Sequence, residues 1–220
     1  MNPKFSSWKV GAPYYAPLFL LSVFAQWALC STAYPYAAAP LWLAALFTLN
    51  FFRDPPRKIT TDPDKIVSPA DGLIDGIDDL DDSPYYDGPC KRVAIFLNVF
   101  NVHINRAPDE CTVQKIEYKE GEFRNAMDPN SSKVNECNML YLETPHGTMT
   151  VRQISGAIAR RIVCVTSEGK QLTKGEKFGM IRFGSRTELF LPQDAEILVG
   201  LKDKVHGGST VIAKMTHNRN

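Results

Sequence analysis

Sequence signatures of the common cofactor sites are missing from this chain of 220 residues. It has no GxGxxG turn, no GxxxxGK(S/T) loop, no HExxH pair and no GxSxG motif. These absences remove the sequence arguments for a dinucleotide, a nucleoside triphosphate, a zinc protease centre and an ordinary hydrolase serine. If the protein is an enzyme, its chemistry depends on other residues.

An excess of charge is missing as well, because 25 basic and 24 acidic residues leave a formal net charge of +1. This balance gives no indication of nucleic acid as a partner. One acidic cluster lacks the glycine and the terminal glutamate of a calcium loop, so we expect a solvated loop and no metal ion there. Its members are Asp75, Asp78, Asp79, Asp81 and Asp82.

Paired cysteines are absent too. The five cysteines are odd in number, far apart and without a CxxC motif, which argues against a disulfide framework and against a zinc knuckle. They are Cys30, Cys90, Cys111, Cys137 and Cys164. We therefore expect the catalytic part of the chain to lie in the reducing cytosol.

Charged residues are lacking from the whole stretch between Lys9 and Arg53. A membrane-spanning helix needs roughly 20 apolar residues, and this stretch has room for two hydrophobic helices, about 14–33 and 38–52, with a turn at 33–36. Basic residues flank both ends, so the positive-inside rule predicts that both ends lie on the cytoplasmic side. We predict a helical hairpin or re-entrant anchor at the cytoplasmic face of the cell membrane.

Two other interpretations of this stretch stay open. One is a cleavable signal peptide, although the hydrophobic region is long, starts late and is followed by a second apolar run. The other is a soluble pair of buried helices, because prolines weaken any claim of a spanning helix. They are Pro13, Pro17, Pro35 and Pro40.

A polar, proline-stiffened linker at 53–57 marks a change of composition, which divides the chain into a segment 1–58 and a catalytic domain 59–220. In the domain, short runs of β-branched and aromatic residues alternate with Gly, Pro, Asn or Asp, which is typical of β-strands. The expected strands are 92–97, 112–119, 138–144, 147–154, 160–165, 180–183, 187–191 and 210–214, with a short helix near 155–161. The predicted fold is a mainly β catalytic domain preceded by an N-terminal hydrophobic helical hairpin.

Three short groups of residues could take part in chemistry. His103, one of four histidines, would share one face of an extended strand with Asn101 and Asn105. Asp71 precedes a glycine in a tight-turn context, and Ser185 follows a glycine between two strand-like runs. Each group alone would also suit a structural histidine, a turn-forming aspartate or a Gly-Ser turn.

Taken together, several motifs in one order resemble the phosphatidylserine decarboxylase family. They are SPADG at 68–72, VHINRAP at 102–108, Asn-Glu at 135–136, QISGAIARRIV at 153–163 and GMIRFGSRTELFLP at 179–192. FFRDP at 51–55, after a hydrophobic leader, is similar to the short bacterial form of the family. Because the resemblance covers nearly the whole chain, it is more specific than any single motif.

The resemblance implies a self-cleaving enzyme. In the family, a serine that follows a glycine attacks the preceding peptide carbonyl and becomes a pyruvoyl cofactor, and the matching pair here is Gly184 and Ser185. The products would be a large chain, 1–184, and a small chain, 185–220, which form a heterodimer that could assemble further. The pyruvoyl carbonyl would form a Schiff base with phosphatidylserine in the membrane, accept the electrons released as CO₂ leaves, and yield phosphatidylethanolamine.

The resemblance also suggests roles for other residues. A serine hydroxyl needs a base, so His103 is assigned as that base, with Asp71 as its partner, and also as the acid for reprotonation. Longer family members carry a second histidine where this chain has Arg106, so either His103 performs both tasks or a base comes from elsewhere. Arg106 either binds the substrate phosphate or carboxylate or forms a structural ion pair. A second Gly-Ser pair at 208–209 competes with Ser185, whose flanks match the family better.

Two other functions stay open. A membrane-anchored β-domain that binds a partner or a lipid without catalysis would remain one intact chain with no reactive carbonyl. A pyruvoyl enzyme that acts on a free amino acid would keep the cleavage but would have no use for the apolar leader.

Overall fold

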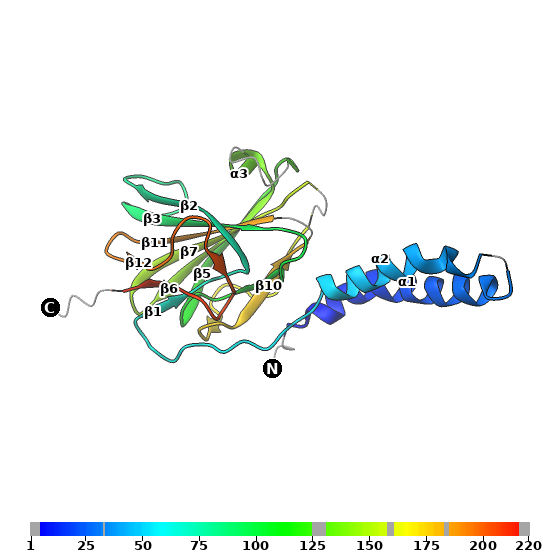
Figure 1. Cartoon of the computed structure of the whole chain (residues 1–220). Coiled ribbons are helices and arrows are strands. Elements are labelled where there is room, and N and C mark those ends of the chain that lie inside the picture. The colour runs from blue at the N-terminus through cyan, green and yellow to red at the C-terminus, as the bar shows by residue number, and fades with distance from the viewer. Residues whose placement is uncertain (1–4, 33, 125–130, 158–160, 183–184, 216–220) are drawn as a thin grey trace. The chain divides into compact units, whose positions relative to one another are not determined.

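The computed structural model describes residues 5–32, 34–124, 131–157, 161–182 and 185–215. The chain forms two compact units. One is Ser6–Pro55, and the other is Pro56–Asn220 together with Met1–Phe5. Figure 1 follows the chain from the helices of the first unit into the strands of the second.

The first unit is a pair of helices, α1 (Ser7–Leu29) and α2 (Ala39–Phe51), joined through the 3-10 helix η1 (Pro35–Ala38). Helix α1 begins earlier than predicted because its first turns pack on the end of α2. Ser7 Oγ donates a hydrogen bond to Phe52 O at 2.7 Å, and a Cβ added at Gly11 would lie 2.4 Å from a Phe52 ring carbon. No helix in the described ranges is both long and apolar enough to cross a membrane.

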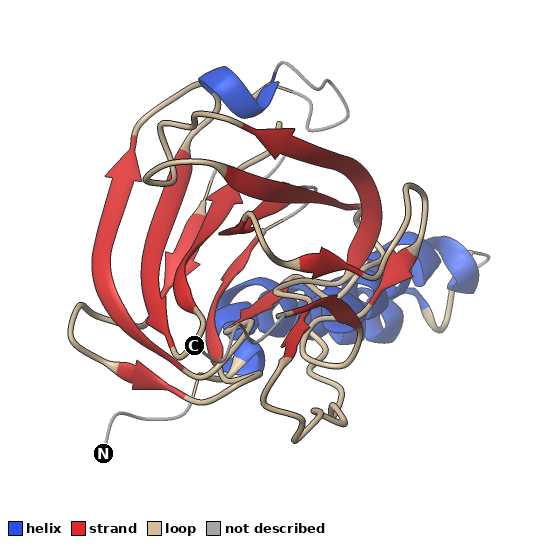
Figure 2. Cartoon of the chain, turned by 90° about the vertical axis from the view of Figure 1, so that its left-hand side faces the viewer, coloured by secondary structure: helices blue, strands red, loops and turns tan. Residues whose placement is uncertain are grey.

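The second unit is built around an antiparallel sheet with the strand order β13-β2-β3-β11-β7-β6-β5-β9. Its strands are β2 (Gly72–Leu80), β3 (Cys90–Leu97), β5 (Cys111–Lys119), β6 (Cys137–Thr144), β7 (Gly147–Ile154), β9 (Gln171–Leu172), β11 (Ser185–Pro192) and β13 (Lys204–Val205). The sheet is curled, so that one of its faces is turned inward (Figure 2).

Two small antiparallel sheets accompany the large one. The first contains β1 (Lys65–Val67), β14 (Val211–Lys214) and β12 (Glu196–Ile197). The second contains β4 (Ile104–Arg106), β10 (Lys177–Ile181) and β8 (Ile162–Cys164), and a short helix α3 (Ser131–Val134) precedes β6. Only residues 182–184 separate β10 from β11, so the second small sheet adjoins the start of the central strand β11.

The inward face of the large sheet changes from apolar to polar along its strands. An apolar row, which belongs to the main hydrophobic core, crosses three neighbouring strands at Leu189, Val151 and Leu140. The next inward-facing row on the same strands consists of Thr187, Gln153 and Asn138. Burying polar side chains costs free energy unless they are hydrogen-bonded, so this polar end of the core is a candidate for function.

The prediction of a mainly β domain behind N-terminal helices is confirmed, and each predicted strand overlaps an observed one. The solvated loop expected at the acidic cluster is wrong for Asp75, Asp78 and Asp79, which lie in β2, where Asp75 pairs with Arg186 and Asp78 with Arg92. Asp81 and Asp82 do lie in an exposed loop after the strand. The helix expected near 155–161 is not formed at its described residues, 155–157 and 161.

Candidate active site

Ser185 is the first residue of β11 and pairs with Leu97 of β3. Its side chain points to the inward face, as do Leu189 and Leu191 further along the strand. The residue is 0 % exposed, and its hydroxyl has no hydrogen-bond partner in the described part of the chain. Gly184, on the other side of the predicted cut, lies outside the described residues. Because buried hydroxyls normally have a partner, this one needs an explanation.

A chain of buried amides lies beside Ser185. Asn105 Nδ2 donates to Thr187 Oγ1 at 3.1 Å, and Asn105 Oδ1 accepts from Gln153 Nε2 at 2.9 Å. Asn138 Nδ2 in turn donates to Gln153 Oε1 at 2.9 Å. Since Asn105 belongs to β4, these bonds join the small sheet to the polar end of the large one and hold Thr187, two residues after Ser185.

One more inward-facing row completes the polar end, and it consists of Ser185, Ser155 and Glu136. The register of β11 and β7, extended by one pair, sets Ser155 opposite Ser185, and the Ser155 N–H donates to Glu136 O at 2.9 Å. Glu136 Oε1 accepts a hydrogen bond from the Tyr118 hydroxyl at 2.8 Å. Its Oε2 and the Ser155 hydroxyl are buried and have no partner among the described residues. Ser155 lies in the QISGAIARRIV motif and Glu136 in the Asn-Glu pair, but neither residue is assigned a role from the sequence.

His103 lies just before β4 and is 0 % exposed. Its carbonyl accepts a hydrogen bond from the Ile181 N–H at 3.2 Å, which sets it at the end of β10 that leads to Ser185. Its Nδ1 lies 3.0 Å from Asn101 O. Because a carbonyl oxygen only accepts, Nδ1 holds the proton and Nε2 is the acceptor of the ring. This is the tautomer that a general base requires.

Asp71 does not pair with His103, so the pairing predicted from the sequence is corrected. The Asp71 carboxylate accepts from Arg57 Nη2 at 2.9 and 2.8 Å and from the Gly207 N–H at 2.9 Å. The histidine beside it is His206, whose Nδ1 lies 3.2 Å from Asp71 Oδ2. Sequence analysis missed this contact because Arg57 belongs to the linker and His206 lies 135 residues from Asp71.

The competing pair at 208–209 forms a turn. Gly208 has a φ of 76°, a conformation that favours glycine. The Ser209 N–H donates to His206 O at 3.0 Å, and Ser209 is half-buried just before β14. These contacts explain the dipeptide structurally and leave Ser185 as the candidate nucleophile.

Arg106 is buried in β4 and opens onto a pocket of about 380 Å³. Its Nη1 donates to Gly175 O at 3.0 Å. The wall of the pocket is rich in cations and also contains Ile59 and Val165. The other cations are Lys170, Lys174 and Lys177. Glu176 also lines the pocket, 3.6 Å from Lys170, and Lys174 pairs with Asp109 at 3.1 Å. With four basic side chains and one acidic one, the lining still suits an anionic group attached to an apolar body.

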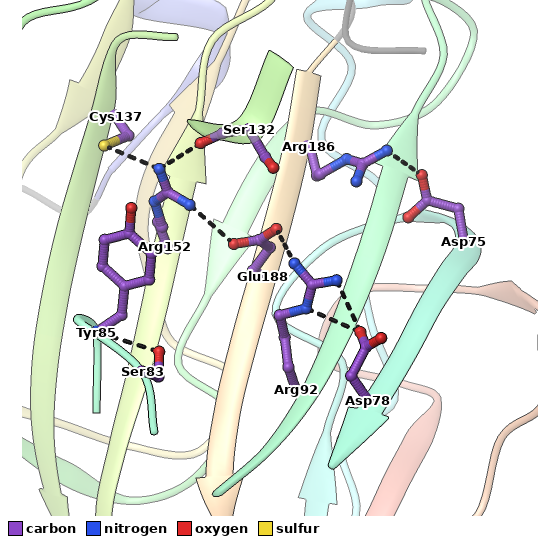
Figure 3. A network of polar contacts seen from close by, with 10 residues as sticks. All are labelled: Asp75, Asp78, Ser83, Tyr85, Arg92, Ser132, Cys137, Arg152, Arg186 and Glu188. Carbon is purple, nitrogen blue, oxygen red and sulfur yellow. Dashed lines mark hydrogen bonds and ion pairs between the residues drawn. The ribbon is translucent and has the colours of Figure 1, made fainter. Parts of the chain in front are cut away.

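The opposite face of β11 bears a network of ion pairs (Figure 3). Glu188 is 0 % exposed and accepts from Arg92 and Arg152, each at 3.1 Å. Arg186, two residues earlier in the strand, pairs with Asp75 of β2. The network therefore links β11 to β2, β3 and β7.

The two arginines that bind Glu188 make further contacts. Arg92 continues to Asp78, with 2.7 Å between Nη2 and Oδ2. Arg152 lies over the ring of Tyr85, 4.0 Å from its centroid, and donates to Ser132 O at 2.5 Å. Burial raises the pKa of the Asp75 carboxyl, and the nearby Arg186 opposes that rise.

Comparison with known proteins matches this chain to one enzyme family. A family model described as phosphatidylserine decarboxylase matches residues 44–213. A phosphatidylserine decarboxylase proenzyme of Magnetococcus marinus is 47% identical over 176 residues, which cover 80% of this chain and 81% of that protein. One of Nitrosomonas eutropha is 42% identical over 209 residues, 93% of each chain. One of Neisseria meningitidis serogroup C is 44% identical over 177 residues, 80% of this chain and 66% of the relative.

Proposed function

Since the chain belongs to the phosphatidylserine decarboxylase family, we propose that it decarboxylates phosphatidylserine with a pyruvoyl group made from its own Ser185. The observation that supports this most directly is the fully buried Ser185 hydroxyl, which has no hydrogen-bond partner in the described ranges. The name proenzyme, borne by the relatives, agrees with a chain that must be processed. The residue thus fits the precursor of a pyruvoyl group better than a structural serine.

Self-cleavage begins at the Ser185 hydroxyl, which attacks the carbonyl carbon of Gly184. The C–N bond between these residues breaks as the C–O bond forms, and the chain becomes an ester. Loss of a proton from the Cα of residue 185 expels the Gly184 carboxylate, and water then replaces the nitrogen, which leaves as ammonia. The elimination needs a base for the Cα proton, and the buried His103, with Nε2 as its acceptor, is our candidate for that step.

The mature site must bind an anionic lipid and protonate the product. When formed, the pyruvoyl group supplies an electron sink for the electrons released as CO₂ leaves. We propose that Arg106 and the lysines of its pocket bind the phosphate of the lipid, since a guanidinium recognises such oxygens bidentately. His103 would deliver the proton that takes the place of the carboxyl group.

The two-helix unit suits a role at a membrane. Its surface exposes large apolar side chains, which for a soluble monomer would be an unusually large apolar patch. Leu20 is 68% exposed, Phe24 62%, Trp27 71% and Leu43 68%. We propose that this unit holds the enzyme at the cytoplasmic face of the cell membrane, where a diacyl substrate is available.

The two products of the cut are expected to stay together. The small chain, 185–220, would contribute β11 at the centre of the large sheet and β14 at the centre of a smaller one. Strand β11 pairs on both sides with strands of the large chain, β3 and β7, and β14 pairs on one side with β1 of the large chain. The mature protein is therefore proposed as a heterodimer of chains from one precursor.

Intact-mass spectrometry under denaturing conditions tests this function. We expect a chain 1–184 and a chain 185–220 that is lighter, by one ammonia, than the same peptide with an amino-terminal serine. Vesicles that contain phosphatidylserine should then release CO₂ in the presence of the protein. A single unmodified chain of 220 residues would refute the proposal and favour a membrane-anchored β-domain that only binds.

A further inference from the structure

We propose that Glu136 and Ser155 form a proton path to Ser185 during self-cleavage, with Glu136 as the proton acceptor and Ser155 as the relay. This inference rests on the proposed function, because it concerns the step in which Ser185 attacks Gly184. It adds two residues to the site and explains why polar atoms without partners occur next to one another in the core.

Strand register is the first support. Thr187 faces Gln153 across β11 and β7, and Gln153 faces Asn138 across β7 and β6. Two residues further along each strand, Ser185, Ser155 and Glu136 therefore occupy one row. The hydrogen bond from the Ser155 N–H to Glu136 O at 2.9 Å extends the β7–β6 ladder to this row.

Side-chain direction is the second support. Residues directly opposite each other in an antiparallel ladder point to the same face, with Cβ atoms about 4.5–5.5 Å apart. Since Thr187, Gln153 and Asn138 meet through Asn105 on the inward face, the next row also faces inward. The side chains of this row are not hydrogen-bonded to one another in the structure, and we propose that a change of χ1 rotamer at the serines brings them into contact.

Unsatisfied hydrogen bonding is the third support. Ser185 is 0 % exposed, Ser155 1% and Glu136 5%. The two hydroxyls and Glu136 Oε2 are all without a partner in the described part of the chain. A buried polar group without a partner costs free energy, and three in one row would be selected against unless the row had a use.

The surroundings hold the relay in position. Tyr118 donates to Glu136 Oε1 at 2.8 Å, which leaves Oε2 as the oxygen that can accept a proton. Asn135 Nδ2 donates to Ser155 O at 2.8 Å and so fixes the backbone of the relay residue. A hydroxyl both donates and accepts, whereas an ionised carboxylate only accepts, so the direction of transfer is from Ser185 through Ser155 to Glu136.

The proton balance closes within the row. As the Ser185 oxygen bonds to the Gly184 carbonyl carbon, its proton moves to Ser155 Oγ, and the Ser155 proton moves to Glu136 Oε2. When the C–N bond breaks, the same path returns one proton to the nitrogen of residue 185. Glu136 ends ionised and Ser155 ends as a hydroxyl, so no further reactant is needed.

The test compares Ser155→Ala and Glu136→Gln with the wild type, as full-length chains made by cell-free synthesis with lipid vesicles. Cleavage is followed over time on denaturing gels, and stability by thermal unfolding. We expect each variant to cleave at least about 10-fold more slowly. Ser155→Ala removes a hydroxyl without a partner in the described ranges and should not lower the stability, whereas Glu136→Gln weakens the hydrogen bond from Tyr118 and should lower it slightly. Because both act in one path, the double variant should be no slower than the slower single variant.

Thr144→Val is the matched control. Thr144 lies in the same hairpin at the far end of β6, and its buried hydroxyl donates to Gly147 O at 2.7 Å. This change should lower the stability but leave the cleavage rate unchanged. If the wild type cleaves and both variants cleave equally fast, the proton path is refuted while the proposed function stands. A wild-type chain that remains whole would refute both.

Discussion

Asp71 and His206 meet across 135 residues of sequence, with 3.2 Å between Asp71 Oδ2 and His206 Nδ1. The same carboxylate accepts two hydrogen bonds from Arg57 and one from the Gly207 N–H. With so many donors, Asp71 is well placed to hold the linker and the C-terminal turn together. The His206 side chain itself is 62% exposed, which is a poor environment for a base that must serve a buried serine.

The two histidines can be distinguished by mutation. We expect His103→Ala to block maturation or turnover, because His103 is buried and lies at the end of β10 that leads to Ser185. His206→Ala should still cleave. The measurement is the fraction of processed chain on a denaturing gel, together with the decarboxylation rate. If His103→Ala cleaves normally and His206→Ala does not, the pair of His206 and Asp71 would be the better candidate for the base.

The two Gly-Ser pairs can be distinguished in the same way. Ser185→Ala should leave one uncleaved polypeptide, because the attacking oxygen is gone. Ser209→Ala should mature normally, because Ser209 lies in a turn before β14. Mass spectrometry of the denatured protein shows whether each variant is one chain or two. Cleavage of the Ser185 variant would mean that the cut lies elsewhere.

The ion-pair network on the outer face of β11 should contribute strongly to stability. Glu188→Gln leaves Arg92 and Arg152 without their buried carboxylate, so we expect a loss of about 3 kcal/mol in the free energy of unfolding. The control is Glu117→Gln, whose partner Lys115 has a side chain 61% exposed, and this change should cost less than about 1 kcal/mol. Urea unfolding of both variants gives the comparison, and equal losses would contradict the expected role of Glu188.

Tyr118 offers a spectroscopic probe of the Glu136 carboxylate. Its hydrogen bond to Glu136 raises the pKa of Tyr118 to about 12. Because the folded state holds this proton more tightly than the unfolded chain does, the contribution to stability is present below pH of about 10 and is lost as the pH rises towards 12.

In Glu136→Gln, the pKa of Tyr118 should fall towards its ordinary value, about 10. Ultraviolet titration of the phenolate measures the change. An unaltered titration would mean that Glu136 is not the group that faces Tyr118, and it would also weaken the assignment of Oε2 as a proton acceptor.

Membrane attachment can be tested without deleting the helices. Leu20→Lys combined with Phe24→Lys charges two residues of α1 that are 68% and 62% exposed. We expect the variant to leave the membrane fraction but to retain self-cleavage. Leu201→Lys, at a residue 61% exposed in the β domain, is the control and should stay with the membrane. Retention of the double variant would refute the proposed anchor.

Strand positions could largely be predicted from the sequence, because half-buried strands keep a two-residue period. The expected strands omit β1, β4, β9, β12 and β13, which are only two or three residues long, and also β2, where aspartates interrupt the apolar pattern. The charges of Asp75 and Asp78 can be accommodated in the sheet because Arg186 and Arg92, from other strands, form ion pairs with them. These ion pairs are tertiary contacts, which the sequence pattern does not show. Helix α1 begins at Ser7, earlier than the predicted start at about 14, and the packing of Gly11 on Phe52, which the sequence does not show, favours the earlier start.

The candidate site was only partly predictable. Ser185 and His103 were proposed from the motifs around them, and both are fully buried in the structure. The partner of Asp71 could not be identified, because His206 is remote in sequence and has no motif of its own. Ser155 lies within the QISGAIARRIV motif, but its proposed role arises from strand register and from a missing hydrogen bond, which the motif does not reveal.

The position of β11 has a consequence for quality control in the cell. The central strand of the large sheet begins at Ser185, the residue proposed to become the cofactor, so the groups around it come together only after β3 and β7 have enclosed it. A misassembled chain would therefore never acquire its reactive carbonyl. Self-cleavage would then give the reactive carbonyl only to those copies of the protein that have already folded correctly.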